Sequence, residues 1–130
     1  MEFSKERIEA QLEKRAKKAL RLVSDNKRAA AAVKKIINKA KKIKGMRRYA
    51  YNIESMCYLV RDYANCKYTE ISNKKVVMMA SAMLYILTPI DLIPDIIPVI
   101  GRLDDIAVIA YVLQSLRVEL VKYNVWRSEH

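Results

Sequence analysis

Apolar residues recur every three or four positions over residues 5–23, which is the spacing that places them on one side of an α-helix. They are Ile8, Leu12, Ala16, Ala19, Leu20 and Val23. Ser4 is an N-cap type of residue before this stretch, and three residues that favour caps and turns follow it at positions 24–26. The pattern therefore predicts one helix over residues 5–23 that ends or bends at residues 24–26.

The next segment, residues 27–44, divides into an apolar face and a basic face. On a helical projection its apolar residues fall within an arc of about 160°; they are Ala29, Ala30, Val33, Ile36, Ile37, Ala40 and Ile43. The opposite arc carries Lys27, Arg28, Lys34, Lys35, Lys39, Lys41 and Lys42. Gly45 follows as a natural helix stop. We expect an amphipathic helix whose outer face is strongly positive.

Three more helices are predicted downstream. One extends over about residues 46–65, and a polar linker follows it. The next has Ser72 as its N-cap and is apolar at every position from Val76 to Leu87 except Ser81, so it has no polar face. A last helix is expected over about residues 103–123. The predicted class is all-α, a small bundle of about four to five helices with a Pro-interrupted, apolar C-terminal helical hairpin.

Composition agrees with a single helical domain over residues 1–130. The chain is 52% hydrophobic and has only two glycines and three prolines, which is too apolar for a disordered chain and too poor in turn residues for a β-sandwich. Its net charge of +11 is unevenly distributed. Residues 1–50 hold 17 basic and five acidic side chains, whereas residues 51–130 hold eight and nine. We therefore distinguish a basic N-terminal region, residues 1–48, from the rest.

The N-terminal residues lack the apolar core of a signal peptide, and the two cysteines, Cys57 and Cys66, form no disulfide or zinc framework. We expect a cytoplasmic protein, not a secreted one, with both thiols reduced.

Residues 88–105 contain all three prolines and four aspartates. The aspartates are Asp91, Asp95, Asp104 and Asp105, and two interpretations of them are open. As caps, they would accept hydrogen bonds from free N–H groups in the first turns of short helices and of the last helix. As ligands, Asp91 and Asp95 above all, they would bind a divalent cation such as Mg²⁺ or Ca²⁺ through carboxylate oxygens. Arg102 is placed to form an ion pair with them.

The same segment resembles the YkvA-like domain-of-unknown-function family. That family's pattern is matched at Tyr85, Pro89, Asp91, Leu92, Ile93, Pro94, Asp95, Pro98, Gly101, Leu103, Asp104 and Asp105. Weaker similarity extends the resemblance to residues 55–120. Two positions differ from the family: Cys66 stands where glycine is common, and Arg102 where an apolar or aromatic residue is usual. The resemblance implies a small helical module, often membrane-associated, without an established reaction.

No catalytic constellation can be assembled from the residues. The one histidine is His130 at the end of the chain, and neither a nucleophile–histidine set nor a glycine-rich phosphate loop is present. We expect a protein that is not an enzyme and that has no cofactor, apart from the cation alternative.

The apolar hairpin over residues 76–121 has two interpretations. It is either the core of a soluble bundle wrapped by the earlier helices or a shallow membrane hairpin, because basic residues flank it and its tip is acidic. Residues 76–87 would form a helix of only about 18 Å, short of the roughly 30 Å hydrocarbon core. A helix without a polar face also makes a homodimer an expectation.

The basic residues give three candidate partners. Lys34, Lys35, Lys39, Lys41, Lys42, Arg47 and Arg48 would bind an anionic lipid surface, an acidic protein or nucleic acid, unless they form only a solvated face. Lysine outnumbers arginine, and no nucleic-acid motif is present, which favours lipid or an acidic protein. The sequence thus predicts an interaction or adaptor module at the cytoplasmic membrane face, with a nucleic-acid-binding accessory protein as the alternative.

Overall fold

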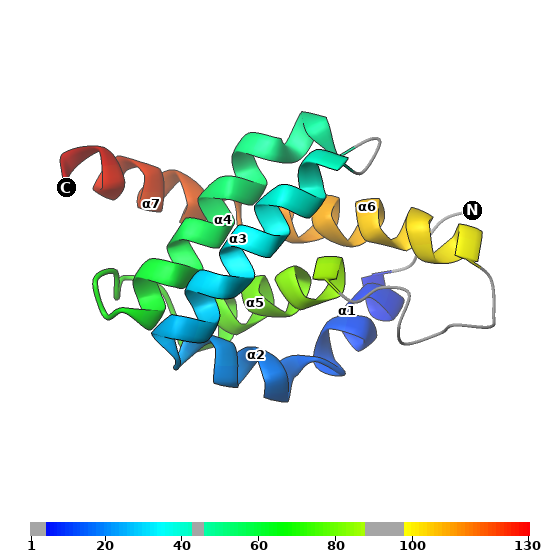
Figure 1. Ribbon diagram of the computed structural model, residues 1–130, viewed down its shortest axis with the longest axis horizontal. Helices are drawn as coiled ribbons and strands as arrows, with labels where there is room; N and C mark the ends of the chain where they lie inside the picture. Colours follow the sequence, from blue (N-terminus) through cyan, green and yellow to red (C-terminus); the bar gives the residue numbers. More distant parts are fainter. Residues whose placement is uncertain (1–4, 43–45, 88–97) are drawn as a thin grey trace.

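The computed structural model describes residues 5–42, 46–87 and 98–130, with the side chains at positions 5, 7, 11, 87 and 98–106 outside that description (Figure 1). All the regular structure in these ranges is helical, which confirms the predicted all-α class. The α-helices are α1 (Lys5–Glu13), α2 (Ala16–Val23), α3 (Asn26–Lys42), α4 (Ala50–Ala64), α5 (Asn73–Leu87), α6 (Pro98–Ser115) and α7 (Arg117–Glu129). A short 3-10 helix, η1 (Arg47–Tyr49), precedes α4.

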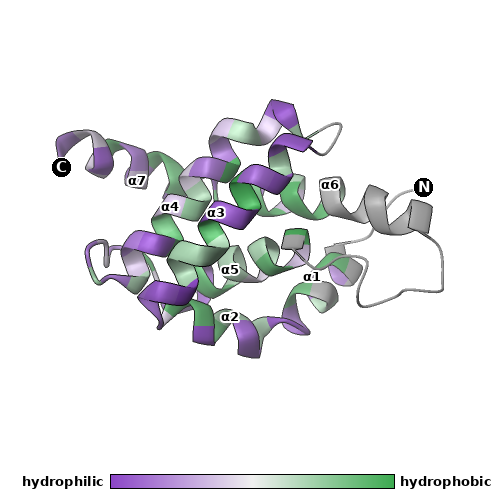
Figure 2. Ribbon diagram, in the orientation of Figure 1, coloured by the Kyte–Doolittle hydropathy of each residue, from purple (hydrophilic) through white to green (hydrophobic). Residues whose placement is uncertain are grey.

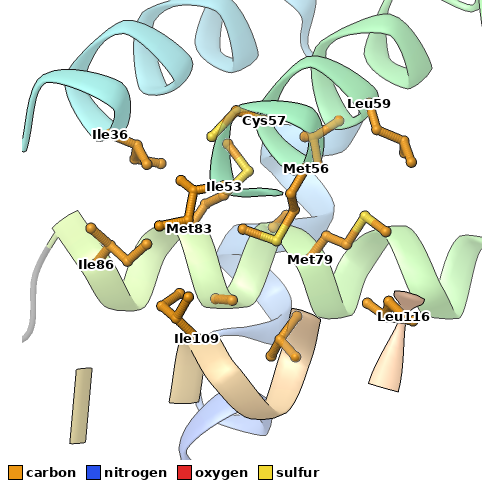
Figure 3. Close-up of a cluster of buried hydrophobic side chains, with 14 of the residues drawn as sticks. Ile36, Ile53, Met56, Cys57, Leu59, Met79, Met83, Ile86, Ile109 and Leu116 are labelled. Atoms are coloured by element: carbon orange, nitrogen blue, oxygen red, sulfur yellow. The ribbon is translucent and has the colours of Figure 1, made fainter. Parts of the chain in front are cut away.

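The central element is α5. It packs against α1, α2, α3, α4 and α6. Figure 3 shows its Met79, Met83 and Ile86 lying between side chains of α3 and α4 on one side and Ile109 of α6 on the other. Every described side chain from Val76 to Ile86 is buried or partly buried. This helix has no polar face, and its five neighbours leave none of these side chains fully exposed.

The two helices of the apolar hairpin are shorter than the roughly 30 Å hydrocarbon core of a bilayer. The 15 residues of α5 extend over about 22 Å, and the 18 residues of α6 over about 27 Å. In the described part of the chain, no helix combines the length and the hydrophobicity needed to cross a membrane.

The first predicted helix is two helices, so that prediction was wrong in its extent. The chain turns at Lys14 and Arg15, between α1 and α2. This turn changes the phase of the apolar stripe, because Leu22 is buried whereas Leu20, which the single-helix pattern placed inside, is 46% exposed. The turn also places the Arg15 side chain in the interior, where its guanidinium lies 4.6 Å from the centre of the Tyr85 ring.

The last predicted helix differs in the same way. Instead of one helix over residues 103–123, α6 begins at Pro98 and α7 follows after a break at Leu116. Proline is well suited to the first helical position because its missing N–H has no intrahelical partner there. The buried Leu116 remains part of the core at the break.

The predicted cap Ser72 is confirmed, and Asp25, one of the three cap-type residues at positions 24–26, caps α3. Asp25 precedes α3, and its Oδ1 accepts hydrogen bonds from the N–H groups of Lys27 and Arg28 at 3.0 and 3.2 Å. Ser72 precedes α5, and its Oγ accepts one from the Lys75 N–H at 3.3 Å. In both cases a side-chain oxygen satisfies N–H groups that the first turn leaves free. The predicted cap Ser4 lies outside the described residues.

The end of α4 is a Schellman motif. The N–H of Lys67 donates to the carbonyl of Asp62 at 2.8 Å, and the N–H of Cys66 donates to that of Tyr63 at 3.0 Å. Cys66 takes the left-handed position of the motif, with a φ of 61°. Glycine is the usual residue there because a Cβ atom is crowded at positive φ.

Cys66→Gly should therefore raise the free energy of unfolding by about 0.5–1 kcal/mol, because glycine adopts this φ without the Cβ contact. Urea denaturation of the wild type and the variant measures the difference. Cys66→Ala is the matched control, since it removes the thiol and keeps the Cβ, and it should stay within about 0.5 kcal/mol of wild type. Equal stabilities for the glycine and alanine variants would contradict the backbone explanation.

Candidate functional site

The motif aspartates are only partly placed. Asp91 and Asp95 lie outside the described residues, so their predicted capping and cation-binding roles stay predictions. Arg102, Asp104 and Asp105 lie on α6, but their side chains are outside the description, and the predicted ion pair of Arg102 is untested.

One capping prediction is wrong. Asp104 and Asp105 were expected to open the last helix, but α6 already begins at Pro98, and its first turn holds no acidic residue. The two aspartates therefore follow the first turn, where backbone N–H groups bond to carbonyls within the helix. An N-terminal cap explains neither of them. Among the described side chains, no group of three or more metal-ligating residues is present.

The lysines of α3 form a charged surface that the structure places. The buried residues of the helix are Ala29, Ala32, Val33, Ile36 and Ala40. Ala30, which the pattern put on the apolar face, is exposed, and Ala32 takes its place. Lys34, Lys35, Lys41 and Lys42 are exposed, and Lys39 is half-buried. Figure 2 shows hydrophilic segments alternating with hydrophobic ones along the ribbon of α3.

Carboxylates are scarce around these lysines. Among the described side chains, none lies within ion-pair distance of Lys34, Lys35, Lys41 or Lys42, and Asp25 pairs with Arg28 at the other end of the helix. Arg47 and Arg48 on η1 are also exposed, and the Arg48 guanidinium lies 5.4 Å from the centre of the Tyr49 ring. We call Lys34, Lys35, Lys41 and Lys42, which lie on the same side of α3, the lysine face. Among the described side chains, this positive surface has no carboxylate paired with it.

A buried carboxylate, which the sequence pattern did not single out as a site, attaches α7 to α4. The Oδ2 atom of Asp62 accepts a hydrogen bond of 2.5 Å from the Tyr123 hydroxyl, and its Oδ1 lies 3.4 Å from Nε of Arg61. Burial, and then the hydrogen bond to Asp62, hold the pKa of Tyr123 well above its usual range. The hydroxyl therefore keeps the proton that it donates.

Aromatic rings surround this hydrogen bond. Tyr68, from the loop after α4, meets the rings of Tyr123 and Trp126 edge-on, each with a centroid distance of 5.1 Å. On the outer side, the guanidinium groups of Arg61 and Arg127 lie 4.5 and 4.2 Å from the centre of the Tyr58 ring. Such contacts favour one orientation of α7 on α4. The signal that could have identified Asp62 is an acidic residue in phase with the apolar position Leu59 of the predicted helix.

Burial also makes one thiol inert. Cys57 is buried in α4, and this desolvation, with the nearby charge of Glu54, raises the pKa of the thiol to about 12. A thiol in that state is a core side chain and not a nucleophile.

The comparisons with known proteins address the motif region. Residues 75–111 match a family described as "Protein of unknown function (DUF1232)". A curated relative from Bacillus subtilis (strain 168), described as "Uncharacterized membrane protein YkvA", is 32% identical over 88 residues, which cover 68% of this chain and 83% of the relative. The chain belongs to the YkvA-like family of proteins of unknown function. No solved structure shows a significant match to it.

The DUF1232 match confirms the resemblance seen in the sequence. It begins near the start of α5 and ends within α6, so it includes the buried central helix and Tyr85, on which Arg15 packs. The lysine face on α3 precedes the matched residues. The family-model match therefore concerns the centre of the bundle and does not include the lysine face.

Tyr123→Phe should lower the free energy of unfolding by about 1–3 kcal/mol, because it leaves the buried Asp62 carboxylate without its hydroxyl donor. Urea denaturation measures the loss, and Tyr51→Phe, at an exposed tyrosine of α4, is the control that should have no effect. The loss should be constant below about pH 10, where tyrosine in the unfolded chain stays neutral, and should shrink above it. The direction follows from the raised pKa, since ionisation of the unfolded state then removes the stabilisation. A loss as small as that of the control would contradict the role of this hydrogen bond.

Proposed function

We propose that the protein is a non-enzymatic interaction module that binds an anionic membrane surface peripherally through its lysine face. The observation that carries this proposal is the exposure of Lys34, Lys35, Lys41 and Lys42 without carboxylate partners among the described side chains. Each lysine close to an anionic leaflet contributes about 1 kcal/mol of attraction. Four such residues on one helix are enough for measurable, reversible binding.

The packing of α3 bears on how deep such binding goes. Val33 and Ile36 are buried in the bundle, where α3 packs on α4 and α5. The apolar face of α3 is therefore engaged within the protein, and only the lysines remain for the lipid. Binding of this kind is electrostatic at the headgroup level, so it requires anionic lipid and weakens as salt screens the charges.

Two further facts favour lipid over nucleic acid. The relative from Bacillus subtilis carries the description of a membrane protein. The basic residues of α3 are also six lysines and one arginine, and the helix has no aromatic residue, whereas arginine and aromatic side chains are the ones that contact phosphates bidentately or stack on bases. A compact ammonium group suits a headgroup phosphate as a point charge.

The test is flotation of the purified protein with vesicles of phosphatidylcholine alone and with phosphatidylserine added, at about 0.1 M salt. We expect flotation only with the anionic vesicles. The combined variant Lys34→Gln, Lys35→Gln and Lys42→Gln should bind at least about 100-fold more weakly, given about 1 kcal/mol for each lysine. Binding to neutral vesicles as well, or none to either, would refute the proposal.

The control variant removes the same charge elsewhere. Lys14→Gln, Lys67→Gln and Lys74→Gln together also lower the net charge by three, at exposed positions outside α3. If the lysine face is the binding surface, this variant should keep most of the affinity, because charges beyond the Debye length of about 10 Å are screened. Equal losses in the two variants would mean that net charge alone drives binding. If the lysine-face variant bound vesicles normally but no longer bound duplex DNA over a series of salt concentrations, the nucleic-acid alternative would be favoured instead.

A further inference from the structure

A second surface lies on α7. Its residues Val118, Val121 and Val125 are 69%, 56% and 56% exposed, although valine is usually buried. Their spacing of three and four places them on one side of the helix. We call them the valine stripe. Isolated exposed apolar residues are ordinary on a protein surface, but three aligned on one helix form a continuous apolar strip.

The valine stripe borders a groove. This groove, of about 480 Å³, lies where α7 meets α6 and the start of α4. Its lining includes the buried Leu113 and Leu120, the exposed ring of Tyr51 and the side chain of Val121. The stripe and the groove thus form one surface, convex along α7 and concave beside it, which we call the α7 groove.

The described charged side chains beside the α7 groove are positive. Arg117 is the one charged residue among those that line the groove, and it lies on one side of the valine stripe, with the exposed Lys122 on the other. The acidic residues of α7 are Glu119, which pairs with Lys75 at 2.9 Å, and Glu129 in the last turn. The surface is therefore apolar at its centre and basic on both sides.

The orientation of this surface is fixed by the opposite side of α7. Tyr123 and Trp126 are held in the Asp62 and Tyr68 cluster, so the stripe cannot turn inward without breaking those contacts. Figure 1 shows α7 at one end of the molecule, extending away from the other helices. The stripe is thus presented outward by a firmly held helix.

From this geometry we infer that the α7 groove binds an acidic amphipathic helix of a partner protein, with apolar side chains in the groove and carboxylates beside Arg117 and Lys122. Helix-in-groove recognition uses apolar anchors at intervals of three and four residues, which is the spacing of the stripe itself. A second copy of this chain fits less well, because a two-fold contact through the same patch would bring Arg117 and Lys122 of both copies together. A flat bilayer surface would leave the concave part unfilled.

The test uses a fluorescein-labelled synthetic helix with leucine at intervals of three and four residues and glutamate between them. Its control is a peptide of the same composition in scrambled order, and fluorescence anisotropy with the full chain gives the affinity of each. We expect the amphipathic peptide to bind at least about tenfold more tightly than the scrambled one, and binding to weaken with salt. Equal affinities would mean that net charge alone attracts the peptides, and would overturn the inference.

Two variants assign the contact. Val118→Thr, Val121→Thr and Val125→Thr together keep the side-chain shape while making the stripe polar, and should weaken the amphipathic peptide at least about tenfold. Leu20→Asn, at an exposed apolar residue of α2, is the matched control and should leave the affinity unchanged. Unchanged binding by the threonine variant would overturn the inference. If the wild type instead sediments as a dimer that this variant disperses, the stripe is a contact between copies and the inference also fails.

The proposed function is tested separately by the same proteins. The threonine variant should float with anionic vesicles as the wild type does, and the lysine-face variant should keep its affinity for the amphipathic peptide. Loss of flotation in the threonine variant would show that the valine stripe contacts the membrane. That result would overturn the inference but would not contradict the proposal that the protein binds an anionic membrane.

Discussion

The arrangement of this protein depends on the need to cover α5 on every side. A helix that is apolar around its whole circumference cannot border water without a large unfavourable free energy, since each exposed aliphatic side chain loses about 1.5–3 kcal/mol of burial. In the structure α1, α2, α3, α4 and α6 all pack on it. The match to the DUF1232 family begins in this helix and continues into α6, its partner in the apolar hairpin. The residues that match the family model therefore include much of the centre of the core, and the surfaces that face outward lie on the helices around it.

The burial of α5 determines which side of each surrounding helix remains exposed for contact with other molecules. The apolar side of α3 is used against α4 and α5, so the outer side is left to the lysines. This explains why most of the basic residues can gather in the first 50 positions without weakening the core, since a solvated ammonium group loses little free energy beside a helix whose other side is packed. Like charges on one face do repel, and no described carboxylate lies within ion-pair distance of these lysines. Under the proposed function, the anionic membrane surface relieves that repulsion.

Local signals in the sequence were sufficient for some elements and not for others. The caps at Asp25 and Ser72 depend on a side chain and N–H groups two or three residues away, so the sequence could predict them. The turn at Lys14 and Arg15 was missed because it accompanies a contact between Arg15 and Tyr85, 70 positions along the chain. The pairing of Asp62 with Tyr123 spans 61 positions and was missed for the same reason. The capping role of Asp104 and Asp105 failed because the helix begins six residues earlier, at a proline that the pattern placed in a connecting segment. Periodicity gives the buried side of a helix, but only the fold gives its ends and its distant partners.

The same distinction applies to the two outward surfaces. The lysine face could be predicted, because a run of lysines on one side of an amphipathic pattern is visible without any knowledge of the neighbours. The valine stripe could not, since valines at positions 118, 121 and 125 look like the buried side of a helix. They face outward because the opposite side of α7 packs on α4. That side carries Leu120, the rings of Tyr123 and Trp126, and the Tyr123 hydroxyl that donates to Asp62. A helix with two apolar sides can bury only one against a single neighbour. The side that holds the larger rings and the hydrogen bond faces the core, and the side with smaller side chains remains for a partner.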